Sequence, residues 1–268
     1  MPEKTKDIRL VIIDPQNDFC HPKGSLFVPG ADQDAGRTAA MIMRIKDKLS
    51  DIHVTLDSHH MVDIAHPIFW ADTDGNPPPP FTIIEVSDVR KGKWRTRNPA
   101  YMKRATDYVM TLEANGRYPL CIWPPHCLIG SEGAQVVAPV FEALKTWEES
   151  FAIVDFVTKG SNFLTEHYSA VQADVPDPDD EGTQLNTRFV KTLQEADEIL
   201  FTGQALSHCV ANTIRDIADN FGDSRIGKFI LLEDTTSPVP GFEDVAIDFV
   251  SEITGRGMRV AKSSEIYN

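Results

Sequence analysis

The chain has 268 residues, of which 41% are hydrophobic and 25% charged, a composition typical of soluble globular proteins. Its net charge of −14 disfavours contact with the phosphate backbone of nucleic acids. No apolar run approaches the roughly 18–20 residues needed to span a bilayer. The N-terminal residues lack the apolar stretch of a secretory signal, and the four cysteines are too scattered for a disulfide framework. These features predict a reduced, cytoplasmic protein that contacts neither membranes nor nucleic acids.

Short apolar strands alternate with helical patterns along the chain. This alternation is typical of an α/β fold, in which helices cover both faces of a parallel sheet. We therefore expect a Rossmann-like three-layer α/β/α architecture with a central, mostly parallel six-stranded sheet. The predicted strands are 8–13, 52–56, 120–123, 151–157, 199–201 and 228–232, and the predicted helices are 32–49, 99–112, 132–147, 207–221 and 242–254.

Two segments interrupt the alternation. Residues 71–97 contain a run of four prolines and a basic patch, and residues 172–187 contain five acidic residues and two prolines. No linker divides the chain, so both segments are expected to be surface excursions on a single domain, 1–268. The acidic run is interpreted as a solvated loop, and cation capture is the less favoured alternative.

Cys209 lies in a segment whose pattern is typical of a buried strand, a tight turn and the start of a helix. Gly203 ends the apolar run, and Ser207 is expected to be the N-cap of the helix. Cys209 would then lie in the first helical turn, where free backbone N–H groups favour a thiolate and an oxyanion. The alternative is that Cys209 is a small buried apolar residue.

Other predicted strands also end at reactive side chains, namely Asp14, Asp57 and Lys159. Because the carboxyl ends of parallel strands meet at one edge of a sheet, these groups are expected to converge with Cys209. Asp14 could take the proton of the thiol, and Lys159 could hold both charges in place. Taken singly, such residues are more often turn residues or solvated charges.

A second group of residues has the chemistry of a metal site. Asp57 and His59 are two residues apart, so on an extended segment they point to the same side. His66 follows shortly, and His126 ends the strand predicted at 120–123. A carboxylate with two or three imidazoles suits Zn²⁺ or another first-row divalent ion. Scattered histidines more often form ordinary hydrogen bonds, which is the alternative.

Several segments together resemble the isochorismatase-like cysteine hydrolases, and among them the nicotinamidases. The matching segments occur in the order found in that family, and they cover most of the chain apart from the two excursions. They include Asp14-Pro-Gln-Asn-Asp-Phe19, Asp57-Ser-His59 with His66, Trp123-Pro-Pro-His126, Lys159-Gly160, Glu166-His-Tyr168-Ser169 and Gly203-Gln-Ala-Leu-Ser-His208-Cys209.

The resemblance implies a catalytic triad and an oxyanion hole. Cys209 would be the nucleophile, Asp14 the general base and Lys159 the electrostatic support. The resemblance also implies a cis peptide bond between Gln204 and Ala205. The backbone N–H groups of Ala205 and Cys209 would then face one oxyanion.

The resemblance further implies a metal site, a ring pocket and a mode of assembly. The metal ligands would be Asp57, His59 and His126, with His66 as a fourth; Zn²⁺ is favoured over Fe²⁺ or Mn²⁺. The ring pocket would be lined by Phe19, Trp123, Tyr168 and His208. Relatives are often dimers or larger, so a homo-oligomer is expected.

The leading hypothesis is a metal-assisted cysteine amidohydrolase that converts nicotinamide or a related ring amide to the acid through a thioester. The alternatives are a metal-free hydrolase of carbamoyl or ureido groups and a non-catalytic binding protein on the same fold. Leu206-Ser207 stands where the family often has Thr-Asp, and Ser58 and His60 replace a Trp and a Pro. These departures leave room for a ring amide other than nicotinamide.

Overall fold

The computed structural model describes residues 6–267, whose core is one six-stranded parallel sheet in the order β10-β9-β8-β1-β2-β7. Every residue of β1 is buried, because this strand lies inside the sheet with helices over both faces. The strands are β1 (Ile8–Ile13), β2 (Asp51–Asp57), β7 (Asp155–Lys159), β8 (Glu198–Gly203), β9 (Phe229–Leu232) and β10 (Arg259–Ala261).

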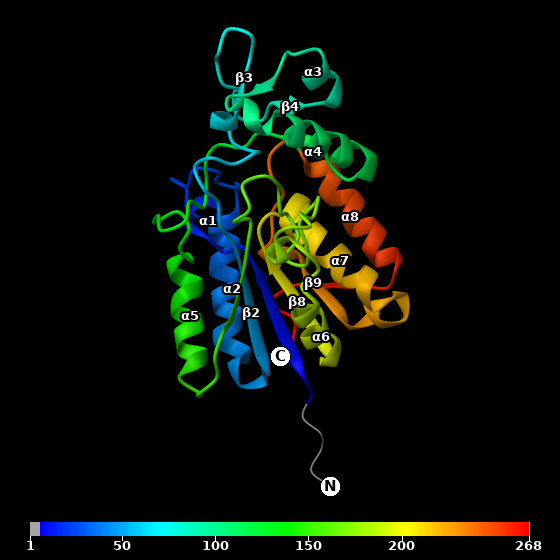
Figure 1. Ribbon diagram of the computed structural model, residues 1–268. Coiled ribbons are helices and arrows are strands. Elements are labelled where there is room, and N and C mark those ends of the chain that lie inside the picture. The colour runs from blue at the N-terminus through cyan, green and yellow to red at the C-terminus, as the bar shows by residue number, and fades with distance from the viewer. Residues whose placement is uncertain (1–5, 268) are drawn as a thin grey trace.

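Helices form the two outer layers, as Figure 1 shows. Helices α2 (Ala31–Ile45) and α5 (Ala138–Glu148) pack together on one face. The other face carries α6 (Thr187–Glu195), α7 (Ala211–Phe221) and α8 (Glu243–Gly255). The predicted α/β/α architecture with a six-stranded central sheet is therefore confirmed.

Two details of the predicted sheet were wrong. The segment predicted as its third strand is β6 (Leu120–Cys121), which pairs antiparallel with β4 (Ile83–Ile84) outside the central sheet. The sixth central strand is instead β10, near the end of the chain. A short apolar run has the same pattern in either sheet, so the sequence could not assign its partner.

Some element boundaries also differ from the prediction. Strand β7 begins at Asp155 rather than at 151, and Phe151 is fully exposed with a φ of +63°. Helix α6 was not predicted, because only three of its nine residues are buried and it directly follows the acidic run. Helix α5 begins six residues later than expected, after a loop that leads to Pro139 at its first turn.

The segment 71–97 folds into small elements at the top of the molecule in Figure 1. These elements are β3 (Trp70–Ala71), β4, α3 (Val86–Arg90) and β5 (Arg95–Thr96), and helix α4 (Met102–Asn115) follows them. The remaining short helices are α1 (Asn17–Cys20), η1 (Lys46–Lys48), η2 (Pro67–Phe69), η3 (Pro99–Tyr101), η4 (Glu181–Thr183), η5 (Leu206–Val210), η6 (Asp223–Lys228) and η7 (Glu233–Thr235).

The acidic segment 172–187 is held against the rest of the chain. The side-chain amide of Asn162 donates to Asp177 at 3.1 Å and to Asp180 at 2.9 Å. Arg104 of α4 forms an ion pair with Asp177. Within residues 6–267, no helix is long and apolar enough to cross a membrane.

The strand register brings the carboxyl ends of the central strands to one edge. Ile13 at the end of β1 pairs with Gly203 of β8, and Asp57 of β2 pairs with Lys159 of β7. A Cβ at Gly203 would lie 2.0 Å from the carbonyl oxygen of Ile13, so only glycine allows this close approach. The chemically reactive residues of the sequence gather at this edge.

Candidate active site and metal centre

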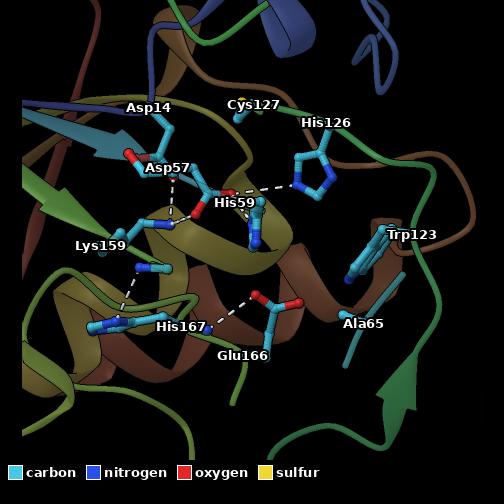
Figure 2. A network of polar contacts seen from close by, with 12 residues as sticks. Asp14, Asp57, His59, Ala65, Trp123, His126, Cys127, Lys159, Glu166 and His167 are labelled. Atoms are coloured by element: carbon cyan, nitrogen blue, oxygen red, sulfur yellow. Dashed lines mark hydrogen bonds and ion pairs between the residues drawn. The ribbon is translucent and has the colours of Figure 1, made fainter. Parts of the chain in front are cut away.

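Lys159 is in contact with three reactive side chains at the edge of the sheet. Its Nζ lies 3.0 Å from Asp14 Oδ2, 3.0 Å from Asp57 Oδ1 and 3.6 Å from Cys209 Sγ. All four side chains are buried. Figure 2 shows Asp14, Asp57 and Lys159 pointing toward one another from neighbouring strand ends. The structure therefore brings together the residues predicted as the triad.

Burial and the ion pairs together determine the protonation of this group. Burial lowers the pKa of Lys159, but Asp14 and Asp57 outweigh it and raise that pKa well above the usual value, so the ammonium is retained. Burial raises the pKa of Asp14, and Lys159 offsets only part of the increase. Burial also raises the pKa of Cys209 well above that of a free thiol, against the effect of Lys159. Cys209 is therefore a thiol at rest, beside a carboxylate of increased basicity.

Cys209 lies in a helical turn, Leu206–Val210, that leads directly into α7. The peptide bond between Gln204 and Ala205, immediately before this turn, is cis, as the resemblance implied. Ser207 was predicted to be the N-cap of the helix, and this was wrong. Its hydroxyl instead contacts His208 Nδ1 at 2.9 Å and the Val239 N–H at 3.0 Å. The side chain competes for these nearby partners and so does not cap the helix.

Asp57, His59 and His126 form a group of ligand atoms that lie within 4.8 Å of one another. His59 Nε2 lies 3.0 Å and His126 Nε2 lies 3.4 Å from Asp57 Oδ2. Figure 2 shows both imidazoles on the far side of Asp57 from Lys159. One buried carboxylate and two imidazole nitrogens fit a divalent first-row metal ion, with positions left for other ligands.

Hydrogen bonds on the opposite ring nitrogens orient both imidazoles. His59 Nδ1 lies 3.0 Å from Asp63 Oδ2, and His126 Nδ1 lies 2.9 Å from the carbonyl oxygen of Pro124. Such partners fix the tautomer and the direction of a metal-binding histidine. Burial lowers the pKa of His59, but Asp57 and Asp63 raise it well above the usual value. Metal binding would therefore displace a proton from His59.

His66 lies beside this group but outside the set of converging ligand atoms. Its ring centroid is 5.2 Å from that of His59 and 5.6 Å from that of His126. Its Nδ1 contacts the carbonyl oxygen of Met61 at 3.3 Å, and its buried Nε2 has no hydrogen-bond partner among the described residues. Burial lowers the pKa of His66 to about 4, so the ring is neutral at physiological pH.

A cavity opens between Cys209 and the metal-ligand group. All four residues predicted for the ring pocket line it, and they are joined by residues that the sequence analysis did not select. The full lining is Phe19, Leu26, Asp57, Trp123, His126, Glu166, Tyr168, Ala205, His208, Cys209 and Val239. Trp123 Nε1 donates to the Tyr168 hydroxyl at 3.0 Å, which fixes two of the aromatic walls.

Sequence reasoning missed three residues of this site. Glu166 lines the cavity, and burial raises its pKa to about 8. Gln16 pairs through its side-chain amide with both the N–H and the C=O of Asp57, each at 2.7 Å. Asp63 orients His59. Glu166 and Gln16 both lie inside motifs quoted above, whereas only the tertiary contact reveals Asp63.

The chain is similar in sequence to a known protein over nearly its whole length. No protein-family model matches the chain. The sequence is 26% identical to the nicotinamidase of Saccharomyces cerevisiae over 263 residues, which cover 94% of this chain and 97% of that protein.

Solved structures show the same relationship at the level of the fold. The yeast nicotinamidase superposes with a TM-score of 0.66 at 20% identity, over 95% of this chain and 99% of that one. A nicotinamidase/pyrazinamidase of Acinetobacter baumanii gives 0.65 at 19% identity, over 98% and 100%. The pyrazinamidase of Pyrococcus horikoshii in complex with zinc gives 0.57 at 20% identity, over 96% and 99%. The chain is thus similar in sequence to the yeast nicotinamidase over nearly its whole length, and it shares the fold of the solved nicotinamidases.

Proposed function

We propose that this protein is a metal-assisted cysteine amidohydrolase that converts nicotinamide, or a closely related ring carboxamide, to the carboxylic acid and ammonia. The observation that carries the proposal is the contact of Lys159 with Asp14, Asp57 and Cys209 at once, beside a buried carboxylate–imidazole group. The similarity to the yeast nicotinamidase over nearly the whole chain supports the choice of substrate.

Acylation would begin with a proton transfer inside the triad. Asp14 takes the thiol proton of Cys209, and the Lys159 ammonium stabilises the resulting negative charge. The thiolate attacks the carboxamide carbon, and the backbone N–H groups of Ala205 and Cys209 hold the oxyanion. Asp14 then gives its proton to the leaving ammonia, which leaves a thioester on Cys209.

Deacylation would use the same groups in reverse order. Water attacks the thioester while Asp14 accepts its proton, and the thiol of Cys209 is restored as the acid leaves. The raised pKa of Asp14 suits a group that must both accept and return a proton. Phe19, Trp123, Tyr168 and His208 would hold the planar ring in the cavity.

Asp57, His59 and His126 would hold the metal ion, and their buried carboxylate and imidazole donors fit it. When bound, the ion supplies a Lewis acid that holds an acceptor atom of the substrate. Zn²⁺ is our first choice over Fe²⁺ or Mn²⁺, in line with the zinc in the Pyrococcus horikoshii structure. His66 is retained as a candidate fourth ligand. We also propose that the protein is cytoplasmic and homo-oligomeric.

The direct test is ammonia release from nicotinamide by the purified protein and by Cys209→Ala. We expect turnover by the wild type and none above background by the variant. Cys121→Ala is the matched control, since Cys121 is buried in β6 but does not line the cavity, and it should retain activity. Equal turnover by the wild type and Cys209→Ala would rule out the thioester mechanism.

A further inference from the structure

Ser207 links the catalytic turn to the ring pocket through its hydroxyl group. The residue is completely buried, directly between Leu206 and His208. The N–H of Val239 donates to Ser207 Oγ at 3.0 Å, and His208 Nδ1 lies 2.9 Å from the same oxygen. No other hydrogen bond of this hydroxyl occurs within residues 6–267. Whether Ser207 Oγ or His208 Nδ1 donates in this contact therefore decides which ring nitrogen of His208 carries the proton.

The bond between Ser207 and His208 can point in either direction. If the hydroxyl donates, His208 Nδ1 accepts, and both the hydroxyl hydrogen and the Val239 N–H have partners in this contact. If Nδ1–H donates instead, the buried hydroxyl hydrogen of Ser207 has no acceptor, and an unpaired buried donor is unfavourable. The contact therefore places the imidazole proton on Nε2.

Among residues 6–267, no ionised side chain raises the pKa of His208. Four aromatic rings lie around the imidazole with centroids 4.7–5.2 Å away, those of Tyr118, Trp123, Tyr168 and Phe242. Burial lowers the pKa of His208 to about 3, so the ring is neutral at physiological pH. Its Nε2–H has no acceptor within the described chain, and the side chain lines the ring pocket.

We propose that Ser207 is a positioning residue that makes His208 a neutral N–H donor, so that the pocket selects ring carboxamides with one additional hydrogen-bond acceptor. This inference rests on the proposed function. A ring without that acceptor would bury the Nε2–H unpaired, whereas a ring that carries it would complete the bond. An acceptor-only side chain at position 207, such as aspartate, would instead hold the proton on Nδ1.

The hydrogen-bond direction can be measured without any substrate. Nitrogen-15 NMR of the full chain distinguishes a protonated ring nitrogen from an unprotonated one, and the loss of signals in His208→Gln assigns them. We expect Nε2 protonated, Nδ1 unprotonated, and no change between pH 5 and pH 8. A ring protonated on Nδ1, or one that titrates in this range, would overturn the proposal whether or not the protein hydrolyses amides.

The specificity can be measured with five amides of nearly the same shape. Nicotinamide is compared with pyridazine-3-, pyrazine-2-, pyrimidine-5- and pyridazine-4-carboxamide, which each add one ring nitrogen at a different position. For at least one diazine, we expect its kcat/KM relative to nicotinamide to fall about tenfold in Ser207→Ala, the size of one neutral hydrogen bond. Ser207→Thr keeps the hydroxyl and should restore the wild-type ratio.

Comparing the same amides between variants cancels their different intrinsic reactivities. Unchanged ratios for all four diazines in Ser207→Ala would overturn the selection of an additional acceptor. Failure of the wild type to hydrolyse any of the five amides would instead contradict the proposed function, and with it the specificity, while the NMR result would still decide the role of Ser207.

Discussion

Lys159 Nζ lies 3.6 Å from the sulfur of Cys209 and 3.0 Å from an oxygen of Asp14, so one ammonium contacts both the proposed nucleophile and the proposed base. Asp14 follows β1 and Cys209 follows β8, two neighbouring strands inside the sheet, whereas Lys159 ends the edge strand β7. The buried ammonium therefore reaches across β2 to side chains from two inner strands.

Lys159→Met should reduce both activity and stability. The variant removes the charge that stabilises the thiolate, so we expect kcat to fall about 10²–10³-fold. It also leaves Asp14 and Asp57 buried without their cation, which should cost about 3–5 kcal/mol in the free energy of unfolding. Ammonia release and urea unfolding measure the two effects.

The matched control for that variant is Lys145→Met. Lys145 is an exposed lysine of α5 that pairs with Glu142 at the surface, so its loss should change stability by less than about 0.5 kcal/mol. A Lys159→Met protein as stable and active as this control would show that the buried ammonium has no role.

Asp14→Asn should remove the proton acceptor while keeping the shape of the site. We expect kcat to fall about 10²–10⁴-fold, the usual contribution of a general base. Because the pKa of Asp14 is raised, the wild-type kcat/KM should decline in acid with a midpoint above about 3.9, the ordinary value for Asp. The exposed Asp47→Asn serves as control. A residual Asp14→Asn activity with the same acid decline would assign the base elsewhere.

His126→Ala should weaken metal binding, whereas His66→Ala should not. His126 Nε2 belongs to the converging ligand atoms and that of His66 does not. We expect elemental analysis after dialysis to find the metal retained in the wild type and His66→Ala and lost from His126→Ala. Loss from both variants would make His66 a fourth ligand, as the family resemblance suggests.

Asp174→Asn should make the protein more stable in alkaline solution. Burial raises the pKa of Asp174 to about 7 in the folded state, although hydrogen bonding by Tyr168 N–H opposes the shift. The folded state thus prefers the protonated carboxyl. Its contribution to stability is present below about pH 4 and is lost as the pH rises through 7.

The neutral amide of the variant avoids this loss. Above pH 7, Asp174→Asn should exceed the wild type by about 2–4 kcal/mol in the free energy of unfolding. Both proteins keep Glu166, so its similar titration cancels in the comparison. Asp179→Asn changes an exposed carboxylate of the same segment and should show no such difference. A constant gap between Asp174→Asn and the wild type from pH 4 to pH 9 would contradict the expectation.

The sequence by itself determined the architecture and the reactive groups. Apolar runs that end at Asp14, Asp57 and Lys159 are sufficient to predict that these side chains converge, because strands of a parallel sheet place their carboxyl ends together. Hydrophobic periodicity and residue spacing are properties of a short segment. They can therefore be read from the sequence without knowing which other segments that segment contacts. Asp14, Asp57 and Lys159 accordingly lie together at one edge of the sheet, where Cys209 joins them after β8. His126 reaches Asp57 from the loop after β6, outside the central sheet.

Only the tertiary structure decided which partner each group has. The pattern of β6 could not reveal that it pairs with β4, and nothing local to position 63 shows that its carboxylate orients His59. The same holds for Ser207, whose sequence pattern predicts a helix cap but whose hydroxyl is taken by Val239 and His208. Hydrogen-bond partners and burial depend on segments far apart in the chain, so their effects arise only when the fold brings those segments into contact.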